Sequence, residues 1–318
     1  MIILFLVSLI SKAQTYAPAA GLLGTSAMFK DSSAFINWAV ACRVARGYQD
    51  ISNPSLGFAA VGDTSMATGK AQINGILSLG DGGSAVCTFK KPIANGIGYD
   101  FAVFENSFND TFLELAFVEV SSDGFNFIRF PSHSLSDTVN QYGNAAILDP
   151  TKINNLAGKY RGGYGTPFDL QELAGRPNLN INAVTHVMIV DVVGSLVKAY
   201  ATYDSFGNKI NDPWTTPFPS SGFDLDAIGV INESLSSGFT KSVKENTVYV
   251  YPNPVLQNDI LKIKSFKDLI SIELTDLNGN LIVSATTSVI DLAGINAGIY
   301  FLKINTSEDF VIKKVVIF

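Results

Sequence analysis

The acidic side chains are the residues of this chain whose types and spacing could do chemistry. Asp224 and Asp226 lie two residues apart in an apolar stretch, so an extended strand would point both carboxylates to one face, about 6.6–7 Å apart. Such a pair repels unless one member is solvated, paired with a cation or bound to a metal. Upstream, Asp100 and Glu105 precede the Asn- and Asp-rich residues 106–110, and carboxylate and amide oxygens are the ligands that Ca²⁺ takes. We therefore predict Ca²⁺ as a cofactor, with Asp100, Glu105, Asp224 and Asp226 as candidate ligands. Turn caps that accept backbone N–H groups are the open alternative.

A second set of candidate residues lies in two long connections, about 132–181 and 194–222. Loops this long in a compact domain are usually functional or carry local structure. Both connections are rich in aromatic residues beside polar donors, the combination that ligand sites use. The predicted ligand site consists of Lys159, Tyr160, Arg161, Tyr164, Trp214 and Phe218. Packing of Trp214 and Phe218, with their neighbouring prolines, onto the body of the domain remains an open alternative.

Catalytic motifs are missing from the sequence. The chain has two histidines, and neither HExxH nor GxSxG occurs. His186 alternates with apolar residues, which favours a structural role, and His133 has no neighbouring ligand. A glycosidase would need two acids facing each other across a groove, and the sequence assigns no such pair. We predict no catalytic residues.

Composition excludes some classes of partner. Of the 318 residues, 47% are hydrophobic and 16% charged, and the net charge is −6. This length suits about two domains, with ample apolar material for their cores. A nucleic-acid partner is not expected, because it would require clustered Lys and Arg.

The N-terminus and the two cysteines bear on location. Residues 1–10 are a continuous apolar run that is too short to span a bilayer. Small residues follow it, so we predict a signal peptide over 1–13, with cleavage before Gln14; a buried N-terminal strand is the alternative. No other segment has the ~18 apolar residues of a membrane helix. Cys42 and Cys87 could pair in an oxidising compartment or remain buried thiols, and both possibilities stay open.

The elements that must position these residues are mostly strands. Apolar residues recur at helical spacing only over 32–46, which predicts one helix there. Residues 112–130 predict a hairpin, because Asp123-Gly124 supplies a tight turn between two apolar runs. Further strands are predicted at 73–79, 83–89, 99–105, 183–193 and 223–231. Many short strands separated by turns indicate a sandwich. We predict an all-β protein with a jelly-roll-type β-sandwich as its binding domain over 14–235.

The last part of the chain predicts a second, smaller domain. A polar linker over 236–246 precedes strand-like runs at 247–318. Four short motifs follow in order: Val250 to Pro254, Asp276 to Gly279, Ala297 to Ile304 and Lys313 to Val316. Together they resemble the type A C-terminal sorting domain of the type IX secretion system. The motif residues are Tyr251, Pro252, Asn253, Pro254, Asn278, Gly279, Gly298, Tyr300, Lys313 and Lys314.

That resemblance implies an Ig-like β-sandwich and a route of export. The chain would cross the inner membrane, be recognised by the type IX translocon and its sortase, and end up secreted or on the outer-membrane surface. No transmembrane segment is expected in the mature chain. An ordinary terminal Ig-like module is the alternative.

The larger domain also carries a resemblance. Three segments are similar to uncharacterised bacterial cell-surface jelly-roll proteins of discoidin or galactose-binding type. They are the hairpin around Val118 to Gly124 and the segments Gly98 to Asn106 and Phe223 to Val230. This implies a fold and a location. We predict a non-enzymatic binding protein with a glycan or another small molecule as ligand. Two alternatives stay open: capture of a nutrient or cofactor such as cobalamin beside an outer-membrane transporter, and a glycoside hydrolase-like enzyme.

Overall fold

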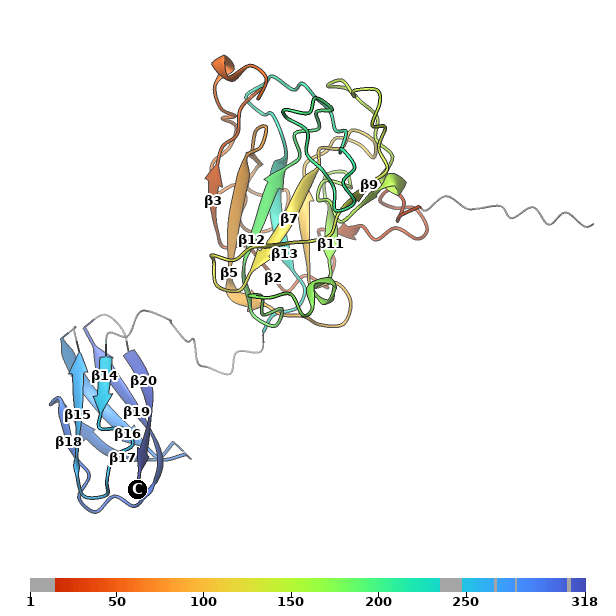
Figure 1. Ribbon diagram of the computed structural model, residues 1–318. Helices are drawn as coiled ribbons and strands as arrows, with labels where there is room; N and C mark the ends of the chain where they lie inside the picture. The colour runs from red at the N-terminus through yellow and green to blue at the C-terminus, as the bar shows by residue number, and fades with distance from the viewer. Residues whose placement is uncertain (1–14, 235–247, 266–267, 278, 308–309) are drawn as a thin grey trace, which may run out of the picture. The chain divides into compact units, whose positions relative to one another are not determined.

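The protein is all-β, as the sequence predicts. A computed structural model describes residues 15–234, 248–265, 268–277, 279–307 and 310–318, and the chain divides into two compact units, Met1–Ser236 and Ser237–Phe318 (Figure 1). The predicted signal peptide over 1–13 and the predicted linker over 236–246 lie outside the described residues. Within the described part of the chain, no helix is both long and apolar enough to cross a membrane.

Two β-sheets form the N-terminal unit. One has the strand order β1-β11-β6-β13-β2, with β4 also paired to β13, and the other has the order β3-β5-β12-β7-β8. All of these pairs are antiparallel. The strands are β1 (Met28–Phe29), β2 (Asn37–Trp38), β3 (Ala41–Ala45), β4 (Leu77–Ser78), β5 (Ser84–Ile93), β6 (Phe101–Glu105), β7 (Ala116–Ser121), β8 (Ile128–Arg129), β11 (Tyr164–Phe168), β12 (Val184–Asp191) and β13 (Asp224–Val230).

The long connections contain short elements of their own. The strands β9 (His133–Ser134) and β10 (Ile153–Asn154) pair with each other. The 3₁₀ turns η2 (Pro150–Lys152) and η3 (Leu170–Leu173) also lie in the first connection, whereas a further 3₁₀ turn, η1 (Pro54–Leu56), lies between β3 and β4. β11 lies within the predicted loop 132–181, so the first of the two long connections enters a sheet.

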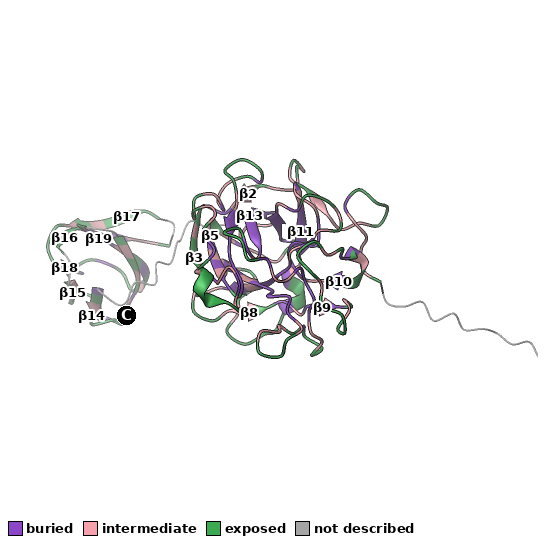
Figure 2. Cartoon of the chain, turned by 90° about the horizontal axis from the view of Figure 1, so that it is seen from above, coloured by how far each residue is buried: buried purple, intermediate pink, exposed green. Residues whose placement is uncertain are grey.

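The core of this unit is buried on both sides of the first sheet. Every residue of β6 and β13 is buried. Phe101 stacks on Phe168 between the sheets, with ring centroids 5.4 Å apart. On the other side, Phe35 and Trp38 cover Phe104. Figure 2 shows buried strands enclosed by exposed loops. The continuous apolar run from Phe101 to Phe104 in β6 is typical of a strand that is buried on both faces.

The predicted helix over 32–46 is wrong. This segment forms turns and the strands β2 and β3. The residues of β3 alternate between exposed and half-buried, because β3 pairs along its whole length with β5. Pairing with a neighbouring strand overrides a short helical pattern. The predicted strand 73–79 is also shorter, since only Leu77–Ser78 pairs.

The C-terminal unit is a small sandwich of two sheets. One has the order β14-β15-β18 and the other the order β17-β16-β19-β20. Their strands are β14 (Val248–Tyr251), β15 (Ile260–Ser265), β16 (Leu269–Thr275), β17 (Leu281–Ala285), β18 (Val289–Asp291), β19 (Gly298–Thr306) and β20 (Phe310–Ile317). Leu261, Leu274 and Leu302 are among the fully buried side chains that fill the space between the sheets.

Candidate functional site

Six acidic side chains gather at one end of the N-terminal sandwich. In the first sheet, β6 ends at Glu105, which pairs with Leu225 of β13. Asp224, the first residue of β13, directly precedes Leu225. In the second sheet, Asp191 ends β12 opposite Ala116 of β7. Long connections lie at this end, the upper end of the unit in Figure 1. The side chains interact electrostatically with one another. We call the following set the acid cluster: Asp81, Glu105, Glu114, Asp191, Asp212 and Asp224.

Backbone amides donate hydrogen bonds to both carboxylate oxygens of Asp191, a member of the acid cluster. Asp191 Oδ1 accepts a hydrogen bond from Phe223 N at 2.8 Å, and Oδ2 accepts one from Gly82 N at 2.9 Å. The nearby Asp224 accepts a hydrogen bond from the Ser78 hydroxyl. Asp191 therefore links the end of β12, in the second sheet, to the residue that precedes β13, in the first sheet.

Two buried oxygen atoms in the acid cluster have no hydrogen-bond partner among the described residues. Glu105 is 1% exposed and Asp212 is 3% exposed. Glu105 Oε2 accepts from Ser107 N at 2.7 Å and Asp212 Oδ2 from Leu115 N at 2.7 Å. Glu105 Oε1 and Asp212 Oδ1 accept no hydrogen bond from any residue that the structure describes. Buried polar atoms without partners are rare and call for an explanation, such as a water or an ion.

Burial raises the pKa of the carboxyl groups in the acid cluster. It raises the pKa of Asp191 to about 8, with the charge of Asp81 adding to the effect. Burial also raises the pKa values of Asp81 and Asp224 to about 6. For Glu105, Glu114 and Asp212 the pKa lies well above the usual range, again because of burial. The cluster thus favours protons or another positive charge near neutral pH.

Only part of the predicted calcium set is found here. Glu105 and Asp224 belong to the acid cluster, whereas Asp100 accepts from Gly96 N and Leu170 N where β6 begins. Asp226 accepts from Gln72 N at 2.9 and 3.0 Å. A bulge between Leu225 and Ala227 breaks the regular alternation of β13. Among the residues that the structure describes, no three His, Cys, Asp or Glu side chains are spaced to hold a metal together.

Two residues of the predicted ligand set lie inside the domain. Lys159 is 4% exposed and its Nζ donates to the Ile153 carbonyl at 2.8 Å; burial lowers its pKa to about 8. Tyr160 is 1% exposed and its hydroxyl bonds to Ser26 Oγ at 2.7 Å. Both side chains point into the domain and attach the loop before β11 to it through these hydrogen bonds.

Trp214 and Phe218 lie in the second connection. Trp214 is half-buried, and its Nε1 donates to Asp81 Oδ2 at 3.1 Å. Its ring lies 6.2 Å from that of Tyr200. Phe218 is 50% exposed. Trp214 therefore contacts the acid cluster directly.

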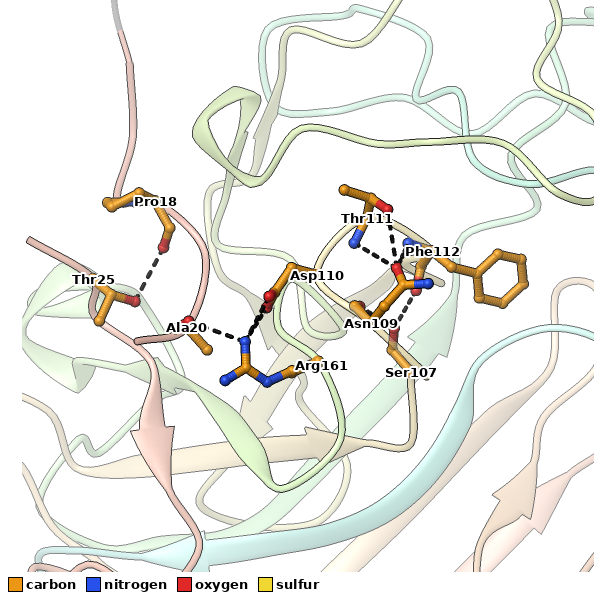
Figure 3. A network of polar contacts seen from close by, with 9 residues as sticks. All are labelled: Pro18, Ala20, Thr25, Ser107, Asn109, Asp110, Thr111, Phe112 and Arg161. Atoms are coloured by element: carbon orange, nitrogen blue, oxygen red, sulfur yellow. Dashed lines mark hydrogen bonds and ion pairs between the residues drawn. The ribbon is translucent and has the colours of Figure 1, made fainter. Parts of the chain in front are cut away.

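Arg161 and Tyr164 form a partly exposed surface with Phe29, which the sequence did not single out, and with Asp110, which belongs to the acidic segment 106–110 considered for calcium. Arg161 Nη1 bonds to both oxygens of Asp110, at 2.7 and 2.6 Å, and to the Ala20 carbonyl at 3.1 Å (Figure 3). The guanidinium lies 4.7 Å from the centre of the Tyr164 ring, which is 5.3 Å from the ring of Phe29. We call Phe29, Asp110, Arg161 and Tyr164 the Arg161 surface.

Local turns place these side chains. Gly163 has φ +80°, and the tight turn closes when Tyr164 N donates to the Arg161 carbonyl at 3.1 Å. In the facing loop, the Asn109 side chain accepts from the backbone N–H groups of Thr111 and Phe112 (Figure 3). Such side-chain turns fix a loop without a regular element. They hold Asp110, which lies between them, against Arg161.

Sequence reasoning missed four of the six members of the acid cluster, namely Asp81, Glu114, Asp191 and Asp212. Asp191 stood as a lone acid in the apolar run 184–193, which is a signal that could have identified it, since a buried charge needs a special reason. Asp212 resembled an ordinary turn residue before a proline. Glu114 alternates with leucines and has no distinguishing signal. Their meeting depends on the register of two sheets.

In the C-terminal unit, the first motif binds the last strand. Asn253 Nδ2 donates to the Lys314 carbonyl at 2.6 Å, and Asn253 Oδ1 accepts from Val316 N at 3.0 Å. Peptide bonds before Pro252 and Pro254 are cis. Tyr251 is 47% exposed. Motif segments more than sixty positions apart in the sequence are therefore neighbours in space.

The remaining motif residues have distinct places. Asp276 accepts from Asn280 N and Nδ2, and Gly279, at φ +84°, completes this turn; Asn278 lies outside the described residues. Tyr300 is buried and its hydroxyl donates to the Asn296 carbonyl at 2.8 Å. Gly298 begins β19, and Lys313 and Lys314 lie on β20 at the edge of its sheet. A hollow of about 390 Å³ lies beside the Asp276 turn, lined by Glu273, Thr275, Asp276, Leu277, Gly279, Phe301, Lys303 and Ile312.

Comparison with known families identifies this unit. Residues 249–318 match the family described as "Secretion system C-terminal sorting domain". This confirms the resemblance to the type IX sorting domain and makes the chain a secreted or cell-surface protein that interacts with this secretion system. No curated protein matches the chain.

Solved structures add little to this. A "Biofilm associated protein - BSP domain" is 11% identical, with a TM-score of 0.19, and the match covers 74% of this chain and 48% of that one. A β-glucuronidase of Parabacteroides merdae is 10% identical, with a TM-score of 0.22, and the match covers 90% of this chain and 35% of that one. The chain spans about half or less of the length of these proteins. TM-scores this low support no argument about activity.

Proposed function

We propose that this secreted or cell-surface protein is a non-enzymatic binding protein, with a glycan as the first-choice ligand and the Arg161 surface as its contact. One observation supports this proposal: an aromatic face lies beside a charged pair. The rings of Tyr164 and Phe29 are neighbours, and the Arg161–Asp110 ion pair lies next to Tyr164. The Arg161 and Asp110 side chains are 32% and 37% exposed, and Phe29 is 45% exposed. Sugars stack on aromatic faces and bond to charged groups at the rim of such faces.

Burial of the acid cluster favours binding over hydrolysis. A glycosidase positions two carboxyl groups on either side of the bond that it cleaves, in an open site. Asp191 and Asp224 are 2% and 6% exposed, so a sugar chain does not reach them in this conformation. The cluster instead accepts hydrogen bonds from residues of the surrounding loops, such as that from Trp214 to Asp81. We propose that calcium, if bound, acts there as a structural ion.

The glycan proposal is tested by binding measurements on matched variants. A glycan array, with cobalamin as a cofactor probe, identifies the ligand; Tyr164→Ala and Arg161→Ala are then titrated with it. We expect each to lose roughly thirtyfold or more in affinity, as aromatic and Arg anchors commonly do. Phe125→Ala is the control, because Phe125 is an 89% exposed aromatic in the β7–β8 turn.

Two outcomes would count against the Arg161 surface. Unchanged affinity in folded Tyr164→Ala would exclude its role. A loss of affinity in Trp214→Ala without a lower melting temperature would move the site to the second connection. We expect the opposite for Trp214, because its bond to Asp81 makes its removal a loss of stability.

A further inference from the structure

The two cysteines of the chain lie directly opposite each other on neighbouring strands. Cys42 of β3 is the Cα partner of Cys87 of β5 in an antiparallel pair. Opposed residues in such pairs have Cα atoms about 4.5–5.5 Å apart, and disulfides require about 4.4–6.8 Å. The backbone spacing therefore suits a covalent bridge without a change of register.

The side chains also point toward each other. Cys87 is fully buried in the core, and Cys42 packs against the same core. The interaction with Cys87 lowers the pKa of Cys42, whereas the same interaction and burial raise the pKa of Cys87. Cys42 is half-buried on an edge strand, so it is the more accessible of the two and the more easily ionised.

We propose that Cys42 and Cys87 form a disulfide when the chain is exported. A protein carrying a sorting domain passes through the oxidising compartment in which disulfides form. The oxidant is a protein disulfide of the thiol–disulfide exchange class. Cys42 thiolate attacks it and forms a mixed disulfide; Cys87 thiolate then attacks Cys42 Sγ and expels the carrier thiolate. Two S–H bonds of this protein and the S–S bond of the carrier break, one S–S bond forms between Cys42 and Cys87, and the two electrons and two protons reduce the carrier to its dithiol.

The bridge closes a segment of the domain that has little regular secondary structure. Residues 43–86 include the short elements η1 and β4 and long irregular stretches between them. Cross-linking the ends of such a segment removes conformations from the unfolded chain. It also fixes β3, the edge strand of its sheet, where an exposed strand can otherwise pair with another chain.

Alkylation and mass spectrometry of the full-length exported protein test the bridge directly. The protein is unfolded in iodoacetamide with and without prior reduction. We expect no alkylated thiol without reduction, two after reduction, and a linked peptide pair containing both cysteines. Alkylation of both thiols in the unreduced protein would overturn the proposal.

Melting curves with and without reductant give a second measure. Reduction of the natural protein should lower its melting temperature by roughly 5–15 °C. Cys42→Ser should melt at the same temperature in both conditions, whatever the cost of the substitution itself. An equal melting temperature of the natural protein with and without reductant would contradict a bridge that constrains the unfolded chain.

Discussion

At the scale of single residues, the acid cluster sets how stability depends on pH. Its carboxyl groups leave water on folding, and each ionised group then costs free energy unless a positive charge compensates. Arg46 is close enough to Asp224 to lower its pKa, but burial is the larger influence. The guanidinium of Arg46 donates to the carbonyls of Val61 and Gly62. Ionising the whole cluster would therefore create more negative charge than Arg46 neutralises.

We expect the protein to be more stable at pH 5 than at pH 8.5. Groups whose pKa is raised by folding contribute stability that is fully present below their unfolded value near 4 and is lost as pH rises through the folded value. That value is about 6 for Asp81 and Asp224 and about 8 for Asp191. Each raised pKa unit is worth about 1.4 kcal/mol. Calorimetry across this range measures the trend, and a flat melting temperature would contradict it.

Glu105→Gln should stabilise the protein at high pH. The amide oxygen can still accept from Ser107 N, and the NH₂ group takes the place of an oxygen that has no partner among the described residues. We expect a gain of about 1–3 kcal/mol at pH 8 and a weaker pH dependence. Glu119→Gln is the control, because Glu119 pairs with Arg129 outside the cluster. An equal gain in both variants would show that the cluster is not responsible.

Calcium should substitute for protons if the acid cluster holds it. At pH 8, a hundredfold excess over the dissociation constant would stabilise the fold by about 2.7 kcal/mol. The melting temperature should then rise with calcium, fall with chelator, and respond less in Glu105→Gln. Identical curves with calcium and with chelator at pH 8 would leave these residues as structural acids.

At the scale of elements, the bond between Asn253 and β20 joins the two ends of the sorting domain. Asn253→Ala removes two hydrogen bonds to the last strand, which should cost about 1–3 kcal/mol and reduce export. Lys262→Ala, an exposed change on β15, should leave both unaffected. The measurements are denaturant unfolding of the full chain and the fraction of protein in the medium. Normal export of a destabilised Asn253→Ala variant would contradict this prediction, because it would show that recognition of the sorting domain does not depend on its stability.

The elements differ in how well the sequence predicts them. β5, β6, β12 and β13 were predicted within a few residues because apolar runs bounded by turn residues are a local signal. The sequence predicts β3 as part of a helix, because its partner strand β5 lies about forty residues away and the pairing that decides its structure is not local. It predicts β11 as part of a loop for the same reason.

At the scale of the whole molecule, the division into two compact units predicts separable roles. Residues 236–318, fused behind a signal peptide and a reporter, should send that reporter out of a cell with a type IX system, because they contain the matched sorting domain. The same chain ending at residue 235 should stay in the periplasm. Retention of the fusion alongside export of the full-length protein would show that the N-terminal unit takes part in recognition.

The sequence by itself determined the all-β class, the sorting domain and the exported location. These rest on local signals: alternating apolar runs, turn dipeptides, and motifs of a few adjacent residues. Arg161 and Tyr164 were also identifiable as candidates, because an aromatic and a cation in one loop are visible in the text.

Only the tertiary structure decided which residues meet. It separated Asp100 and Asp226 from Glu105 and Asp224, buried Lys159 and Tyr160, and placed Asp110 against Arg161. It also set Cys42 opposite Cys87. The places of the strand residues depend on strand register and on bulges, where a shift of one residue turns every side chain to the other face. The places of the loop residues depend on turns that bring distant parts of the chain together. Composition and spacing along the chain do not carry that information.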